Sequence, residues 1–196
     1  MKRNRKFIAT LVLAAAALTG CGSSPTPRFY TLSAPEQPTA TAVYSVTVGP
    51  VSVPDVVDRP QFVLRTAANE VLIAEQSRWA ESLKSGIARV IAANLAQALV
   101  DAHVSAYPQG TGSEADYRVV VDIQRFDSVP GEAATVEALW VVRPKAKGLA
   151  TRSGRSLVRE PAPGKGYDTL VAAHERALAR ISREIAEAVR AARAKP

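Results

Sequence analysis

The stretch YRVVVDIQRF, residues 117–126, decides the fold class of this chain. Its odd-numbered residues from Tyr117 to Ile123 are apolar and alternate with residues that are mostly polar. This period of two predicts a β-strand with one buried face and one exposed face. Phe126 falls out of phase with the buried face, so we expect a bulge near residues 124–125. The chain is therefore expected to contain a sheet.

Further strands are predicted on both sides of this one. Runs of β-branched and aromatic residues, separated by Pro, Gly and Asn, identify them. The predicted strands are 28–32, 43–53, 62–65, 71–74, 104–107, 135–143 and 157–159, the last of them after a turn at Ser153 and Gly154. In strand 43–53 the face of the valines changes at Gly49 and Pro50, so a bulge or an edge position is expected there.

Two long amphipathic helices complete the prediction. The first runs from about Arg78 to Ala102, is capped by Ser77, and carries Trp79 in its first turn as a core anchor. The second runs from about Thr169 to Ala192. The order strands, helix, strands, helix predicts an α+β fold, a mostly antiparallel or mixed β-sheet with two long helices packed against it.

The N-terminus has the pattern of a bacterial lipoprotein signal. Basic residues at positions 2–6 precede an apolar run at 7–18, shorter than the ~20 residues of a membrane-spanning helix. The run ends in Leu18-Thr19-Gly20-Cys21, which resembles a lipobox, and Cys21 is the only cysteine. Lipidation of Cys21 is therefore expected, whereas an ordinary secretory signal with an incidental or buried thiol is the alternative.

This pattern divides the chain into a signal peptide at 1–20, a lipidated tether at 21–27 and a single domain at 28–196. The resemblance to enterobacterial lipoproteins, in which an Asp after the cysteine retains the protein in the inner membrane, implies that Gly22 favours export to the outer membrane. A domain of this length can bury a sizeable core and needs no disulfide. The formal net charge is +7, and removal of the signal peptide lowers it to +3. This small excess argues against a nucleic-acid partner.

The sequence offers no recognisable catalytic or metal-binding set. Only two histidines, His103 and His174, are present, whereas Zn²⁺ commonly needs several His, Cys or acidic ligands. The motifs of serine hydrolases, P-loops and dinucleotide-binding proteins are absent. His174 lies on the apolar stripe of the last helix, which favours a half-buried packing role. We expect no enzymatic activity, cofactor or metal; a periplasmic hydrolase that uses His174 with a distant acid is the competing hypothesis.

A polar loop bracketed by prolines, residues 54–60, is the candidate interaction segment. Because proline restricts the backbone, such a loop presents its hydrogen-bonding groups rigidly. On residue types alone, the simpler interpretation is a surface loop with a turn at Asp58 and Arg59.

Taken in order, several segments make the chain resemble the ABC-type transport auxiliary lipoproteins, in particular their PqiC-like members. The segments are FYTLS (29–33), VGPV (48–51), VPD (53–55), DRPQ (58–61) with Arg65, RWAESL (78–83), YRV (117–119), FD (126–127), Trp140 and AAH (172–174). Residues 144–163, which include the basic Lys145, Lys147, Arg152 and Arg155, follow no firm pattern of that family.

The resemblance implies an outer-membrane lipoprotein that acts as the accessory or docking subunit of an intermembrane lipid transport system. Its partner would be an MCE-domain, PqiB-like protein, with phospholipid as cargo, and a homo-oligomer would match the ring formed by that partner. Asp55, Asp58, Arg59, Gln61 and Arg65 would then form a partner surface or a latch between subunits. A structural envelope lipoprotein that acts without a transporter is the alternative.

Overall fold

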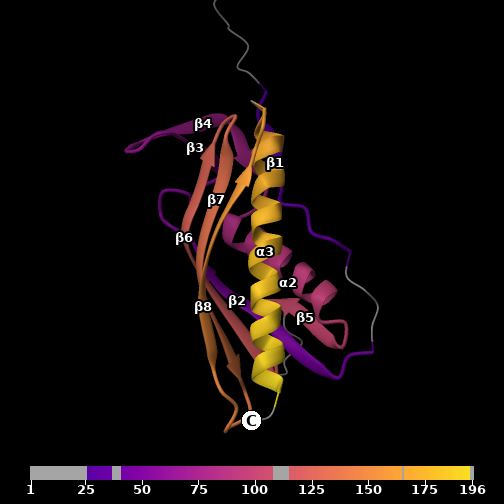
Figure 1. Cartoon of the computed structure of the whole chain (residues 1–196). Helices are drawn as coiled ribbons and strands as arrows, with labels where there is room; N and C mark the ends of the chain where they lie inside the picture. Colours follow the sequence, from indigo (N-terminus) through magenta and orange to yellow (C-terminus); the bar gives the residue numbers. More distant parts are fainter. Residues whose placement is uncertain (1–25, 37–40, 108–114, 165, 195–196) are drawn as a thin grey trace, which may run out of the picture.

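The computed structural model describes residues 26–36, 41–107, 115–164 and 166–194 and confirms an α+β domain (Figure 1). In chain order its elements are β1 (Arg28–Tyr30), β2 (Tyr44–Ser52), β3 (Gln61–Ala67), β4 (Glu70–Trp79), α2 (Leu83–Ala98), β5 (Ala102–Ala106), β6 (Tyr117–Val129), β7 (Ala133–Pro144), β8 (Arg152–Pro161) and α3 (Tyr167–Arg193). The described strands form two sheets, one of three strands and one of five.

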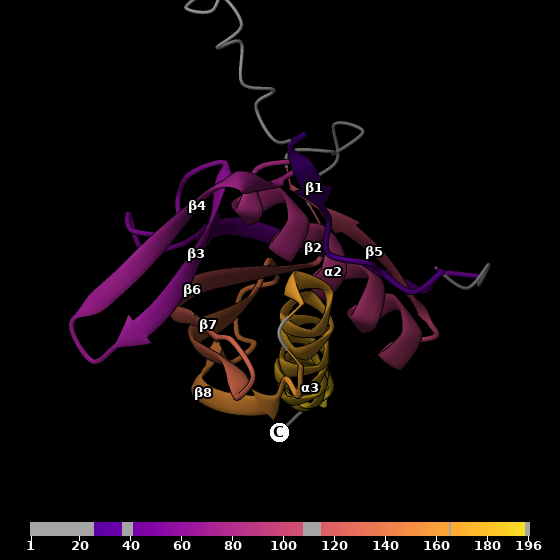
Figure 2. The same cartoon turned by 90° about the horizontal axis from the view of Figure 1, so that it is seen from above.

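The five-stranded sheet forms the body of the domain. Its strand order is β5-β2-β6-β7-β8, in which β2 runs parallel to β5 and β6 while β6, β7 and β8 are antiparallel. The bulge predicted in β6 is confirmed between Ile123 and Arg125. Both helices cover the same face of this sheet: α2 packs on β2 and β5, and α3 packs on β7 and β8 (Figure 2). The opposite face of β6, β7 and β8 carries the exposed positions of the alternating pattern, which include Arg118 and Arg143 but also Leu139 and Leu157.

The irregularity predicted at Gly49 and Pro50 is confirmed as a register shift between β2 and β6. Gly49 has a φ of +131°, a backbone conformation that residues with a side chain rarely adopt. A Cβ atom at this position would also lie 2.7 Å from the Cβ atom of Tyr107. Both its conformation and the close approach of Tyr107 therefore require glycine here.

The three-stranded sheet, with order β1-β4-β3, contains the predicted hairpin of β3 and β4. It also corrects the predicted start of the first helix. β4 continues to Trp79 because its last residues pair in parallel with β1, where Ser77 lies opposite Arg28. Ser77 therefore caps no helix, and α2 runs only from Leu83 to Ala98. No helix in the described part of the chain is long and apolar enough to cross a bilayer.

Gly154 lies inside a strand and not in the predicted turn. β8 begins at Arg152 and pairs with β7 along its length, so that Gly154 stands opposite Trp140. A Cβ atom on residue 154 would lie 2.3 Å from Cζ2 of Trp140. The indole Nε1 donates to Ser156 Oγ at 2.9 Å, and Ser156 in turn donates to Glu184 of α3. The glycine thus makes room for a ring and does not reverse the chain.

A cluster of aromatic rings joins the two sheets. Phe62 of β3 stacks on Trp79 with their ring centroids 4.6 Å apart, and Trp79 meets Phe126 of β6 edge-on at 6.4 Å. Tyr30 and Tyr167 both contact the edge of this cluster at Phe62. Trp79 is only 7% exposed, which confirms its predicted role as a core anchor, although it acts from a strand.

Candidate functional site

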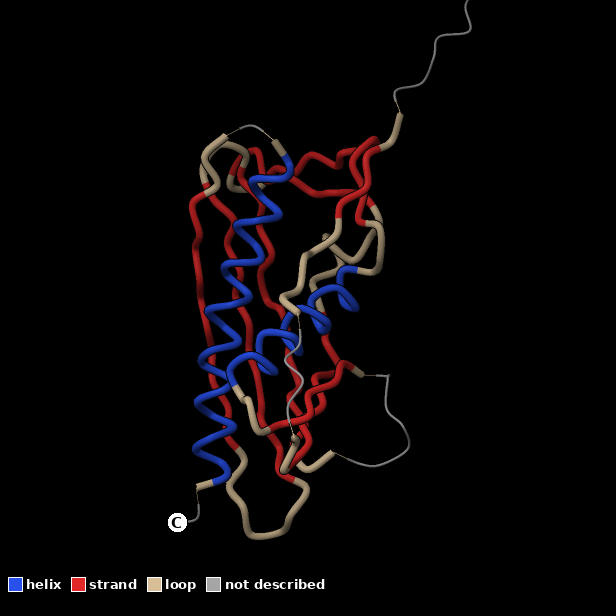
Figure 3. Tube along the Cα trace, turned by 90° about the vertical axis from the view of Figure 1, so that its right-hand side faces the viewer, coloured by secondary structure: helices blue, strands red, loops and turns tan. Residues whose placement is uncertain are grey.

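The segment that follows the predicted tether is fastened across both helices. We call residues 29–36 the N-terminal strap. After β1 the strap leaves the three-stranded sheet and passes along α2 and α3 (Figure 3). Leu32 at its centre is only 1% exposed, so the strap contributes to the hydrophobic core.

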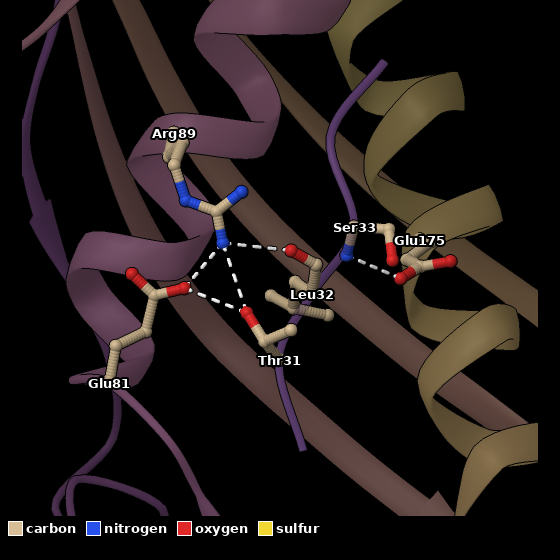
Figure 4. Close-up of polar contacts among 6 residues, drawn as sticks. All are labelled: Thr31, Leu32, Ser33, Glu81, Arg89 and Glu175. Carbon is tan, nitrogen blue, oxygen red and sulfur yellow. Dashed lines mark hydrogen bonds and ion pairs between the residues drawn. The ribbon is translucent and has the colours of Figure 1, made fainter. Parts of the chain in front are cut away.

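Polar contacts hold the first half of the strap to α2 (Figure 4). The Arg89 guanidinium donates to the Leu32 carbonyl at 2.8 Å and to Thr31 Oγ1 at 3.2 Å. The same guanidinium forms an ion pair with Glu81, whose Oε1 accepts from Thr31 Oγ1 at 3.0 Å. One arginine therefore ties a backbone carbonyl and a side chain of the strap to the helix.

The second half of the strap is held by both helices. The Ser33 amide donates to Glu175 Oε1 of α3 at 2.5 Å, and Gln97 Nε2 of α2 donates to the Glu36 carbonyl at 2.7 Å. The peptide groups of an isolated extended segment have no partners of their own, and these side chains supply them. The arrangement attaches the start of the domain firmly to its two helices.

Asp58 and Arg59, two of the predicted interaction residues, face one pocket. It has a volume of about 450 Å³ and lies between the 58–60 segment and residues 79–83. Lys84 Nζ is 2.6 Å from the Asp58 carboxylate, so this acid is already paired. The Arg59 guanidinium makes no hydrogen bond to a described residue, and its Nε is buried. Arg59 is therefore available to an incoming carboxylate or phosphate oxygen.

Arg65 lies apart from this pocket and connects the two sheets. Its Nη2 is 2.9 Å from Oδ1 of Asp127 on β6, whose Oδ2 accepts from Arg125 Nε at 2.6 Å. Although burial opposes the effect, the hydrogen bonds from Arg65 and Arg125 hold the pKa of Asp127 below its ordinary value. A second depression of about 340 Å³ lies beside this ion pair.

The other two predicted residues have separate surroundings. Asp55 is exposed in a turn, in which the Pro54 carbonyl accepts from the amides of Val57 and Asp58 at 3.0 and 3.1 Å. Gln61 Nε2 donates to Glu75 Oε2 at 3.3 Å across the hairpin. The structure thus brings Asp58 and Arg59 together, whereas Gln61 and Arg65 contact other groups.

His174 is fully buried, and not half-buried as predicted. Its ring stacks on Phe126 with the centroids 3.7 Å apart, and its Nε2 lies 2.8 Å from Ser128 Oγ. Burial lowers the pKa of His174 to about 3, against the opposing charge of Asp127. The other ring nitrogen, Nδ1, has no hydrogen-bond partner among the described residues. This serine–histidine pair therefore lacks both an orienting acid and contact with solvent, which a hydrolytic pair needs.

Sequence reasoning missed Glu81, Arg89 and Glu175, the residues that hold the strap. Glu81 lies within a segment that carries the family resemblance, but nothing in the chain marks its contact with Thr31. Arg89 and Glu175 have the ordinary pattern of polar residues on amphipathic helices. Among the described residues no group of three or more His, Cys, Asp or Glu side chains could hold a metal ion.

The fold and the strap define a class of protein. It is an α+β domain whose N-terminal segment is hydrogen-bonded to both helices and whose surface pockets are lined by charged side chains. The chain belongs to the family of ABC-type transport auxiliary lipoprotein components, whose model matches residues 30–186. It is accordingly an auxiliary lipoprotein of a transport system. None of the curated proteins matches the chain.

At least two crystal structures share this fold. A crystal structure of an uncharacterized protein superposes with a TM-score of 0.69 at 21% identity, over 84% of this chain and 99% of the other. Protein XCC0632 from Xanthomonas campestris, of family DUF330, gives a TM-score of 0.63 at 18% identity, over 83% and 93% of the two chains. The PelC dodecamer from Paraburkholderia phytofirmans is a more distant match, with a TM-score of 0.41 at 15% identity over 89% and 96%.

Proposed function

We propose that this protein is an outer-membrane-anchored periplasmic lipoprotein and the accessory, docking subunit of an MCE-type intermembrane lipid transport system, as in the PqiC-like members of its family. Phospholipid is the proposed cargo, and the transport system maintains membrane integrity. Family membership supports the transport role, and the pattern ending in Cys21 supports the anchor. The protein would contribute binding and positioning and no catalytic step.

The N-terminal strap is the observation that carries this proposal. Cys21 precedes Phe29 by eight residues. Even a fully extended chain of that length spans roughly 28 Å, so a lipid on Cys21 would keep the start of the strap near the bilayer. Because side chains of α2 and α3 hold the strap, the helices and the sheet they cover would be attached to the membrane with it. Two or more acyl chains make such an attachment stable.

The proposed contact residues for the MCE-domain, PqiB-like partner are Asp55, Asp58, Arg59, Gln61 and Arg65, of which Asp58 and Arg59 share one pocket. Among these residues, the Arg59 guanidinium makes no hydrogen bond to a described residue, and a carboxylate of the partner would pair with it at the pocket. The turn that begins at Pro54 fixes the loop by backbone hydrogen bonds, which limits the ordering cost of binding. A second copy of this chain is the alternative partner for these residues, because an assembly of several copies would match a ring-shaped partner.

The test is affinity purification of the full-length, lipidated protein from outer-membrane fractions, followed by mass spectrometry of the recovered proteins and lipids. We expect an MCE-domain protein and phospholipid with the wild type, and loss of the MCE-domain protein with Arg59→Gln. Arg183→Gln, which removes an exposed arginine from the middle of α3, is the matched control. Recovery of the lipoprotein alone, or with cell-wall material, would favour a structural envelope role instead.

The anchor has its own test. Cys21→Ser should remove the protein from the outer-membrane fraction, because serine has no thiol to accept the lipid. If the variant stays in the outer membrane, the attachment does not depend on this cysteine.

A further inference from the structure

A short segment between β4 and α2 touches both the pocket at Arg59 and the N-terminal strap. We call residues 79–82 the connecting segment; it runs from the last residue of β4 to the residue before α2. All four of its residues line the pocket that Asp58 and Arg59 face, which we call the Arg59 pocket. The segment also carries Glu81, which accepts from Thr31 Oγ1 of the strap at 3.0 Å (Figure 4). The pocket and the strap therefore share one stretch of backbone.

Consecutive amides of the connecting segment bind the two sides in turn. The Trp79 amide donates to the Pro60 carbonyl, which belongs to the pocket, at 2.7 Å. The next amide, that of Ala80, donates to the Tyr30 carbonyl of the strap at 2.8 Å. Because a planar peptide unit joins the two residues, a displacement of the strap from Ala80 also disturbs the backbone that holds the pocket loop.

Aromatic packing follows the same route. The Tyr30 ring of the strap meets Phe62 edge-on, with the ring centroids 5.9 Å apart, and Phe62 stacks on Trp79 at 4.6 Å. Trp79 in turn lines the Arg59 pocket. Main-chain hydrogen bonds and side-chain packing thus connect the strap to the pocket through the same residues.

The charges of the Arg59 pocket leave one guanidinium open. Asp58 is paired with Lys84, and Glu81 is paired with Arg89, so both acids of the lining are compensated. The Arg59 guanidinium makes no hydrogen bond to a described residue. An anionic group that pairs with Arg59 would also rest on the connecting segment, in the conformation in which that segment holds the strap.

A strap that opens locally is the second state that coupling requires. Leu32 is the only buried residue among residues 29–36, and the two hydrogen bonds that hold the second half of the strap are exposed. Segments with few buried contacts and exposed hydrogen bonds open more readily than the core of a domain. A ligand that binds the closed state better than the open state shifts this equilibrium towards closure.

We propose that the Arg59 pocket and the strap are one coupled unit: an anionic group bound at Arg59 fastens the strap, and a fastened strap strengthens binding in the pocket. The two effects are equal, because coupling between two sites is reciprocal. This inference rests on the proposed function, in which a carboxylate of the partner occupies the pocket. Docking of that partner would then tighten the connection between the domain and the segment that precedes the strap.

The test attaches an anion inside the pocket of the full-length, lipidated protein in nonionic detergent. Ser82 lines the pocket, is exposed and makes no capping hydrogen bond, so Ser82→Cys introduces a thiol with little disturbance. Cys21 is the only native cysteine and carries the lipid in this preparation, so the new thiol reacts alone, which intact mass verifies. One sample receives the anionic 2-sulfonatoethyl methanethiosulfonate, and the other receives the neutral 2-hydroxyethyl reagent of similar size.

Hydrogen–deuterium exchange of the strap amides is the measurement. We expect the sulfonate adduct to exchange about fivefold more slowly than the neutral adduct, or slower still, which corresponds to ordinary coupling between two sites. Amides of β8, an edge strand of the other sheet, should exchange equally in the two adducts. Arg59→Gln in the same protein should abolish the difference at the strap, because glutamine supplies no positive charge.

A strap variant tests the connection itself. Thr31→Val removes the hydroxyl that donates to Glu81 and leaves the lining of the pocket intact, so it should reduce the difference between the two adducts. Thr66→Val removes a hydroxyl that donates to Glu70 at the hairpin, and as the matched control it should keep the full difference.

Four results would overturn the proposal. They are equal strap exchange in the two adducts, equal slowing of β8, a difference that persists in Arg59→Gln, and an undiminished difference in Thr31→Val. Because no partner protein is present in these measurements, their failure is distinguishable from failure of the purification experiment above. Loss of the MCE-domain protein with Arg59→Gln, together with equal strap exchange, would leave a docking pocket that acts independently of the strap.

Discussion

The buried histidine of α3 predicts that the domain loses stability on mild acidification. His174 is neutral in the folded protein, because burial lowers its pKa to about 3. In the unfolded chain the imidazole has an ordinary pKa of about 6.5. Above pH 6.5 both states are neutral and the group has no effect on stability. Below it the unfolded chain binds a proton that the folded protein does not, so stability falls as the pH falls towards 3.

The magnitude follows from the difference between the two pKa values. Each pH unit within this window removes about 1.4 kcal/mol from the free energy of unfolding. Because the folded pKa of about 3 lies well below pH 5, the folded protein stays unprotonated at His174 between pH 7 and pH 5, and only the unfolded chain takes up the proton there. The expected loss from this one side chain over that interval is about 2 kcal/mol. This is a measurable fraction of the stability of an ordinary domain, which is about 5–15 kcal/mol.

The assay is urea unfolding at pH 7 and pH 5 of the wild type and of His174→Gln. Glutamine can still hydrogen-bond Ser128 but does not titrate, so the wild type should lose about 2 kcal/mol more than the variant on acidification. Carboxylates such as Asp127 contribute to both proteins and cancel in the comparison. His103→Gln, at an exposed position, is the control and should behave like the wild type. Equal losses in the wild type and His174→Gln would refute the reasoning.

Three further predictions follow from single contacts. Gly154→Ala places a Cβ atom 2.3 Å from the Trp140 ring and should cost about 1–3 kcal/mol, measured by thermal unfolding; an unchanged Tm would mean that the ring moves freely. Leu32→Ala empties a fully buried site under the strap and should cost about 2–5 kcal/mol, with faster proteolysis at the N-terminus of the domain. A small loss with unchanged proteolysis would show that the strap is not part of the core. Arg118→Gln with Arg143→Gln relieves a like-charge pair and should raise stability at low salt by about 0.2–1 kcal/mol; a decrease would show that repulsion between these two arginines does not dominate.

Part of the candidate site could be predicted from the sequence. The prolines at positions 54 and 60 indicated a fixed polar loop, and the loop is indeed held by a backbone turn. Which side chains share a pocket depends on packing: Arg59 meets Trp79 and Leu83, residues that follow it only after the intervening hairpin. Arg65 pairs with Asp127, which lies on a strand of the other sheet. Because the two residues are far apart in the sequence, their spacing could not predict this ion pair.

The sequence by itself determined the fold class, the bulges in β2 and β6, the burial of Trp79 and the long α3. Each of these follows from the local periodicity of apolar residues or from the backbone preferences of Gly and Pro. Both effects act over only a few neighbouring positions. Only the tertiary structure decided that β4 extends to Trp79, that Gly154 admits a tryptophan ring, and that Arg89 and Glu175 hold the strap. Those features depend on partners that are distant along the chain. Periodicity shows which face of an element is buried, but the identity of what covers it is decided by the pairing of strands and helices in space.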